Sequence, residues 1–177
     1  MKNEYFVKLI IGAIFLDPRL VENAKTKMRQ LKLNIQFQSV EFPFDLTEYY
    51  SKEMGNDLKR CFLCIEGLQK LENFFEWKLK MIEIENCLRQ NGRRTINLDP
   101  GYIDSHRVVL LSGKEGSQKI YLQKGIWADL ILLRKKGGYQ ELPWTFPDIR
   151  QGRYDRFFQQ VLKQLKEEKK LQQKKYN

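Results

Sequence analysis

The sequence predicts an α+β fold: a ferredoxin-like βαββαβ sheet-and-helix layer, extended by antiparallel strands and followed by a C-terminal helix. Apolar periodicity indicates the order strand, helix, strand, strand, helix, strand up to residue 98. A series of short strand-like segments with glycine-containing turns follows between residues 107 and 138. Helices on one face of a mostly antiparallel sheet are the arrangement that this order favours.

The chain begins with a predicted buried strand and an amphipathic helix. Residues 7–16 are apolar and rich in isoleucine, which is typical of a strand that is covered on both faces. Asp17 and Pro18 then supply an N-cap residue and a proline at the first helical position. Apolar residues such as Val21 and Ala24 follow at the spacing of a helix.

Two more strands and the clearest helix of the chain are predicted next. Residues 35–42 show the alternating apolar and polar pattern of a strand. The alternation is interrupted between Phe37 and Val40, which predicts a bulge there. Residues 58–65 form the third predicted strand, after an irregular segment. Residues 70–90 carry apolar side chains at spacings of three and four and predict a well-covered helix.

The remaining residues predict a fourth strand, an antiparallel section and a last helix. Residues 94–98 form the fourth strand, and Pro100 and Gly101 are expected to stop it at a sharp turn. A hairpin turn is expected at Gly137-Gly138, and an amphipathic helix begins near Tyr154. The short strands between them are expected at residues 107–111, 119–122 and 126–134.

Length and charge predict one domain with a basic end. At 177 residues and 42% hydrophobic, residues 1–177 fit a single domain that buries roughly 70% of the surface of its unfolded chain. Residues 148–177 hold nine Lys or Arg and four Asp or Glu, so they carry +5 of the formal charge of +10. Residues 163–177 predict a basic, partly frayed helix end, either solvated or in salt-sensitive contact with RNA.

Cysteine usage and hydropathy predict a cytoplasmic protein without membrane segments. The three cysteines do not suggest a disulfide framework, and no signal-peptide core follows Lys2. The longest apolar run covers residues 9–16, whereas a membrane helix needs about 20 residues. Cys61 and Cys64 share a CxxC spacing, but in a strand they would point to opposite faces, so no metal site is predicted.

The most sharply defined candidate site is the segment from Asn97 to Tyr102, with the sequence NLDPGY. Strand alternation puts Asn97 and Asp99 on one face, and Arg93 and Arg94 lie just upstream. A carboxylate, an amide, a phenol and two guanidiniums so close together suit a polar or anionic ligand. The structural alternative is a turn in which Asp99 caps backbone N–H groups.

Two further segments are candidates for the same site. The irregular segment before residue 58 holds Asp45 and Glu53, which could act with Asp99 as a metal or acid–base group, or belong to a surface loop pinned by tyrosines. Residues 142–148 place Trp144 between two prolines, as a pocket wall or an aromatic clamp on the core. P-loop, Rossmann, GxSxG and HExxH motifs are absent from the sequence.

A set of motifs spans nearly the whole chain in a fixed order. They are Phe42-Pro-Phe-Asp45, Tyr49-Tyr50, Glu53-Met-Gly55, Asn97 to Tyr102, Lys114, Ile120-Tyr-Leu122, Gly125-Ile126 and Pro143 to Asp148. In these motifs the chain resembles the bacterial domain-of-unknown-function family 4416. The resemblance implies a cytosolic bacterial protein of unassigned activity and names no reaction.

The leading hypothesis is a domain that binds an anionic small molecule or a nucleotide-like group. The residues expected to contact the ligand are Asn97, Asp99, Tyr102, Arg93, Arg94, Tyr49, Lys59, Arg60, Lys114 and Trp144. One alternative is a metal-assisted hydrolase or phosphotransfer enzyme that uses Asp45, Glu53 and Asp99. Another is an RNA- or ribosome-associated protein that uses its basic C-terminal helix. The sequence assigns no cofactor and no oligomeric state.

Overall fold

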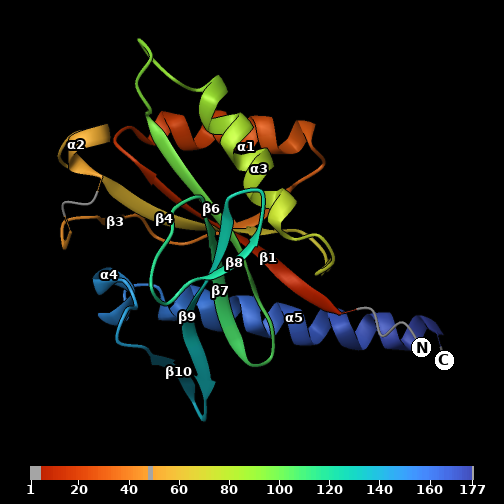
Figure 1. Ribbon diagram of the computed structural model, residues 1–177. Helices are drawn as coiled ribbons and strands as arrows, with labels where there is room; N and C mark the ends of the chain where they lie inside the picture. Colours follow the sequence, from red (N-terminus) through yellow and green to blue (C-terminus); the bar gives the residue numbers. More distant parts are fainter. Residues whose placement is uncertain (1–4, 48–49, 177) are drawn as a thin grey trace.

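The computed structural model describes residues 5–47 and 50–176, and their strands form one ten-stranded antiparallel sheet (Figure 1). Along the sheet the order is β10 (Gly138–Glu141), β9 (Ile126–Lys135), β7 (Arg107–Ser112), β6 (Ile96–Ile103), β1 (Phe6–Phe15), β4 (Lys59–Ile65) and β2 (Ile35–Gln38). Three short strands pair off this path: β3 (Phe42–Pro43) with β4, β5 (Gln69–Lys70) with β1, and β8 (Ile120–Gln123) with β9.

Helices cover both faces of the sheet. In Figure 1, α1 (Pro18–Gln30) and α3 (Phe75–Cys87) lie on one face, and α5 (Asp155–Tyr176) crosses the other. Two one-turn helices, α2 (Ser51–Met54) and α4 (Pro147–Arg150), were not predicted. The expected mixture of helices with a large antiparallel sheet and a C-terminal helix is confirmed. Among the described residues, no helix combines the length and apolar composition needed to cross a membrane.

The first strand and helix agree with the prediction. Leu9 packs in the core below α1 and α3, and Ile10 packs in the core above α5, so β1 is covered on both faces. Asp17 caps α1, because its side chain accepts a hydrogen bond of 2.9 Å from the backbone N–H of Arg19. Pro18 occupies the first helical position, as expected.

The predicted helix at residues 70–90 is too long at its start. Gln69–Lys70 instead forms β5, and Asn73 adopts a left-handed φ of 54°, so the chain turns before α3 begins at Phe75. The second predicted strand is also too long: β2 ends at Gln38, and its register shifts between Ile35 and Phe37 rather than after Phe37.

The main correction concerns Pro100 and Gly101, which continue β6 instead of ending it. All eight residues of β6 pair with β1, whereas β7 pairs only with Gly101–Ile103. Pro100 therefore has a neighbouring strand on one side only, which is where a sheet tolerates proline. A Cβ on Gly101 would lie 2.0 Å from the carbonyl oxygen of Val109, so the close approach of β7 requires glycine.

Candidate functional site

The candidate site lies along the part of β6 that β7 does not reach. Ile96 and Leu98 pack into the core under α1 and α3, and Asn97 and Asp99 are buried outside that core, so the predicted alternation is confirmed. Because no strand among the described residues pairs with this side of β6 before Gly101, side chains of α3 reach its backbone directly.

Lys78 of α3 is the first such side chain, and its burial was not predicted. Its Nζ lies 2.9 Å from Oδ1 of Asp99, 2.7 Å from the Leu98 carbonyl oxygen and 3.3 Å from Oε1 of Glu85. Glu85 also accepts a hydrogen bond of 2.7 Å from the Leu98 N–H. Lys78 and Glu85 therefore supply the pairing that a second strand would otherwise give to this stretch of β6.

Arg94 and Asn97 complete what we call the charged cluster: Lys78, Glu85, Arg94, Asn97 and Asp99. Arg94 donates to Oε2 of Glu85 at 2.8 Å and to Oδ1 of Asn97, and Asn97 donates to Oδ2 of Asp99 at 2.7 Å. Arg94, Asn97 and Asp99, which the sequence placed in one candidate site, are in contact with one another. The sequence missed Lys78 and Glu85, whose only signal is a pair of opposite charges seven residues apart on one helix.

The charged cluster sets the ionisation of Asp99. Burial alone would raise the pKa of Asp99, but the charge of Lys78 and the hydrogen bonds from Lys78 and Asn97 outweigh it and hold the pKa below its ordinary value. Burial likewise opposes the charge on Arg94, yet Glu85 and Glu53 raise the Arg94 pKa. Asp99 is thus an ionised, fully paired carboxylate rather than a free base.

A cavity of about 170 Å³ borders this cluster, lined by Arg94, Asn97 and Asp99 together with Glu53 and Lys114. The Lys114 Nζ lies 4.0 Å from Oε2 of Glu53. Five residues of the predicted site and its acid–base candidates therefore meet here. Tyr49, which was also predicted, lies outside the described residues.

Other predicted ligand-binding residues have structural partners elsewhere. Arg60 is fully buried and contacts both oxygens of Asp148, at 3.1 and 3.2 Å, which ties α4 to the sheet. Tyr102 packs edge-on against Phe74 in the core under α3. Lys59 is exposed, with its Nζ 3.9 Å from Oε2 of Glu41. The structure does not bring these three residues to the charged cluster.

The three carboxylates of the enzyme hypothesis do not form one group. Asp45 pairs with Arg153 at 3.2 Å and lines a separate cavity, while Glu53 and Asp99 border the charged cluster. Within the described ranges, no group of three or more His, Cys, Asp or Glu residues could hold a metal ion. Cys61 and Cys64 lie in the cores on opposite faces of β4, as their spacing predicted.

A second cavity, of about 440 Å³, has Asp99 and Trp144 among its lining residues. Trp144 is 41% exposed, and its indole N–H donates to the carbonyl oxygen of Leu130 at 2.7 Å, so the ring is both a cavity wall and a clamp on β9. Asp129 of β9 also lines this cavity, and its Oδ1 is buried without a hydrogen-bond partner among the described residues. Burial raises the Asp129 pKa, against the opposing effects of Lys119 and a hydrogen bond from Gln118.

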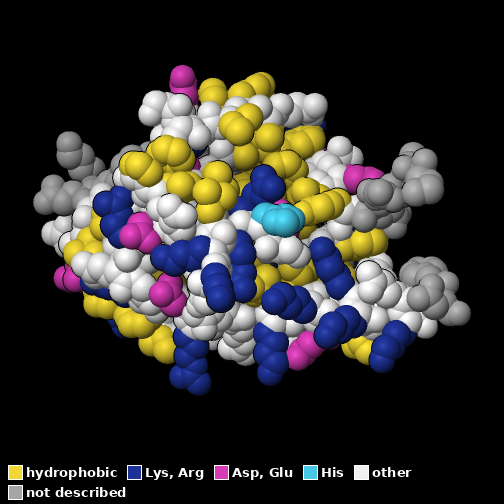
Figure 2. All heavy atoms as spheres, turned by 90° about the horizontal axis from the view of Figure 1, so that it is seen from below, with side chains coloured by type: hydrophobic (Ala, Val, Ile, Leu, Met, Phe, Trp, Pro, Cys, Tyr) yellow, Lys and Arg dark blue, Asp and Glu magenta, His cyan; other side chains and the backbone are white. Residues whose placement is uncertain are grey.

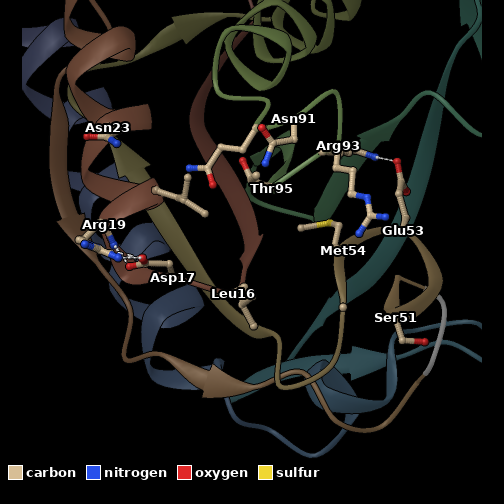
Figure 3. A pocket seen from close by; sticks show the side chains of 14 residues that line it. Leu16, Asp17, Arg19, Asn23, Ser51, Glu53, Met54, Asn91, Arg93 and Thr95 are labelled. Atoms are coloured by element: carbon tan, nitrogen blue, oxygen red, sulfur yellow. Dashed lines mark hydrogen bonds and ion pairs between the residues drawn. The ribbon is translucent and has the colours of Figure 1, made fainter.

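A larger cavity than these is a cleft of about 1270 Å³ between the start of α1, α2 and the turn before β6 (Figure 3). Arg93 and Arg94 line it together with Glu53. In Figure 3 the Arg93 side chain extends from the turn into the cleft toward Met54, while Arg19 lies on the opposite side of the cleft, where it is paired with Asp17. We call this the arginine cleft.

The C-terminal helix carries the basic residues that suggested contact with RNA. Figure 2 shows Lys and Arg side chains spread over the face of the molecule that α5 covers. Helix α5 continues to Tyr176, beyond the last buried leucine, Leu165. Binding of RNA to this helix stays a prediction.

Comparison with known proteins gives a family but no activity. A family model described as "Domain of unknown function (DUF4416)" matches residues 5–165, which confirms the resemblance seen in the sequence motifs. No curated protein and no solved structure matches the chain.

Proposed function

Because the chain belongs to the family described as domain of unknown function DUF4416, which specifies no ligand, we propose from its geometry that it binds an anionic small molecule in the arginine cleft. The observation that carries the proposal is Arg93. Its guanidinium is exposed to the cleft and pairs with no acidic side chain among the described residues, unlike those of Arg19 and Arg94. An unpaired guanidinium beside a second one suits a bidentate carboxylate or phosphate group.

The other lining residues support the same ligand class. Arginines at positions 19, 93 and 94 face two acidic residues, Asp17 and Glu53, so the lining carries one excess positive charge. Uncharged donors surround them: Asn23, Ser51, Gln90, Asn91 and Thr95. Leu16, Leu20 and Met54 add an apolar part to the lining. A cleft with this combination has room for a ring as well as an anionic group, as a nucleotide-like ligand requires.

Isothermal titration calorimetry and thermal unfolding with AMP, ribose 5-phosphate and adenosine test this proposal. The two phosphate-bearing compounds are expected to bind and to raise the unfolding temperature, because a ligand that binds only the native state stabilises it. Arg93→Gln is expected to weaken their binding by about tenfold or more, the value of one charge-assisted contact.

Arg156→Gln is the matched control, since Arg156 is an exposed arginine of α5 that does not line the cleft. It is expected to leave binding unchanged. If neither phosphate compound binds at a concentration of about 10 mM, the proposal is contradicted, because a dissociation constant above that value is too weak for a specific site. Equal losses in the two variants would instead indicate a non-specific effect of net charge and would also contradict it.

We also propose that residues 6–103 form a ferredoxin-like unit to which the later strands were added. The strand order β6-β1-β4-β2, with all pairs antiparallel, supports this. The position of α1 and α3 on the same face supports it too (Figure 1). In such a unit the arginine cleft lies where the first helix begins, beside the turn that leads into the fourth strand.

A further inference from the structure

We propose that the cavity between Asp99 and Trp144 binds an organic ammonium ion, with Asp129 as its anionic partner. The cavity measures about 440 Å³, within the range of small-molecule sites. None of its lining residues lines the arginine cleft, so an anion there and a cation here would occupy different places. This site is additional to the proposed function and is independent of it.

Asp129 is the group that points to a missing ligand. Its side chain is 4% exposed, and its Oδ1 finds no hydrogen-bond donor among the described residues. Buried carboxylate oxygens in folded proteins are nearly always paired, so a donor supplied by a bound molecule would satisfy this atom.

The charges around the cavity favour a cationic donor over a neutral one. Asp99, Glu115 and Asp129 line the cavity with one cation, Lys119. Lys119 already donates to Oγ of Ser112 at 3.1 Å and to the Lys114 carbonyl oxygen at 3.0 Å. Lys78 neutralises Asp99. Two acidic groups of the lining, Asp129 and Glu115, then remain with a single cation, Lys119. A positive charge in the cavity would restore the balance.

Trp144 supplies the second element of an ammonium site. Its ring is half-exposed and held in place by the hydrogen bond to Leu130, so it is ready to cover a ligand without reordering. Aromatic faces attract ammonium groups, and tryptophan does so most strongly. The apolar side chains of Leu110 and Leu111 lie in the same lining and would contact a hydrocarbon body. A primary amine carried on an apolar ring or chain fits these groups.

Calorimetric titration of the full chain with phenethylamine and with 2-phenylethanol, its neutral hydroxyl analogue, tests the proposal. The amine is expected to bind about tenfold or more tightly than the alcohol, because only the amine brings a charge to Asp129. Asp129→Asn keeps the side-chain shape and is expected to abolish this preference. Trp144→Ala is expected to weaken amine binding and to reduce the preference over the alcohol without abolishing it, because the charge of Asp129 remains.

Asp57→Asn is the control, since Asp57 is an exposed carboxylate outside this cavity, and it is expected to leave both affinities unchanged. Circular dichroism establishes that each variant is folded. If Asp129→Asn does not fold, the proposal is still tested by comparing the amine with the alcohol in the unmodified chain and in Trp144→Ala. Equal affinity for amine and alcohol would overturn the proposal, as would a preference that survives in Asp129→Asn or no amine binding at about 10 mM.

Discussion

Lys78 is the residue on which the buried charges of β6 depend. Its ammonium group faces two carboxylates, Asp99 and Glu85, and is itself almost entirely removed from solvent. Removing one partner of a buried ion pair leaves the other charge uncompensated, which destabilises more than the loss of an exposed pair. Arg94 continues to pair with Glu85, so the uncompensated group would be Asp99.

Lys78→Met is therefore expected to lower the free energy of unfolding by about 3–5 kcal/mol near neutral pH, measured by urea denaturation. Lys80→Met is the control, because Lys80 is exposed on the same helix. The loss should shrink as the pH falls. Lys78 holds the Asp99 pKa below its ordinary value, so its stabilisation is present above the unfolded pKa of about 4 and is lost as Asp99 is protonated.

Two results would contradict this account of Lys78. One is a loss of stability that is equal at neutral and at acidic pH, which would indicate lost packing rather than lost charge. The other concerns the double variant Lys78→Met with Asp99→Asn, which removes both charges and should recover part of the loss. A double variant less stable than Lys78→Met alone would show that Asp99 was not the group left unpaired.

At the scale of single residues, the sequence predicted three of the five members of the charged cluster. Asn97 and Asp99 were recognised because strand alternation puts them on one face, and Arg94 because it lies just upstream of them. Lys78 and Glu85 were not, because charged residues on a helix ordinarily face solvent. Their burial follows from the missing strand beside β6, a tertiary feature that no local pattern contains.

Strand β6 shows why the boundaries of elements were harder to predict than their types. Pro-Gly usually marks a turn, so the sequence by itself predicts that the strand ends there. The structure instead places Pro100 where β6 has one neighbour and Gly101 where β7 makes its closest approach. Proline still lacks a backbone N–H and glycine still lacks a Cβ, as in a turn. Whether these properties end or continue the strand depends on β1 and β7, which are not adjacent to Pro100 and Gly101 in the sequence.

Gly101→Ala is expected to lower the free energy of unfolding by about 3 kcal/mol, the upper end of the range for an overpacked core. The added Cβ would lie 2.0 Å from the Val109 carbonyl oxygen and 2.9 Å from the Leu110 Cα, so β6 and β7 would have to separate. Gly113→Ala, just after β7, is the control because a Cβ there meets nothing within 4 Å. Thermal and urea unfolding that fail to distinguish the two variants would contradict the close approach.

Across the whole molecule, the C-terminal helix is attached to the centre of the sheet beyond its last buried leucine. Lys8 of β1 is completely buried, and its Nζ lies 2.8 Å from Oε1 of Glu168 and 2.9 Å from Oε1 of Gln36. The sequence predicted a basic, partly frayed end over residues 163–177, because Lys, Glu and Gln replace the apolar pattern beyond Leu165. It could not predict the ion pair, since Lys8 and Glu168 are 160 residues apart.

Two truncations separate the attached part of α5 from its free end. A chain that ends after Lys170 keeps Glu168 and loses residues 171–177, of which Leu171 is 60% exposed. Its unfolding free energy is expected to stay within about 0.5 kcal/mol of the full chain. A chain that ends after Lys166 leaves the buried ammonium of Lys8 without its carboxylate and is expected to lose about 3–5 kcal/mol.

Glu168→Gln in the full chain distinguishes the ion pair from the length of the helix, because it removes the charge and keeps every turn of α5. If Lys8 needs this carboxylate, the substitution reproduces most of the loss seen in the chain that ends after Lys166. If the substitution has little effect while the shorter chain is destabilised, the last turns of α5 act through packing.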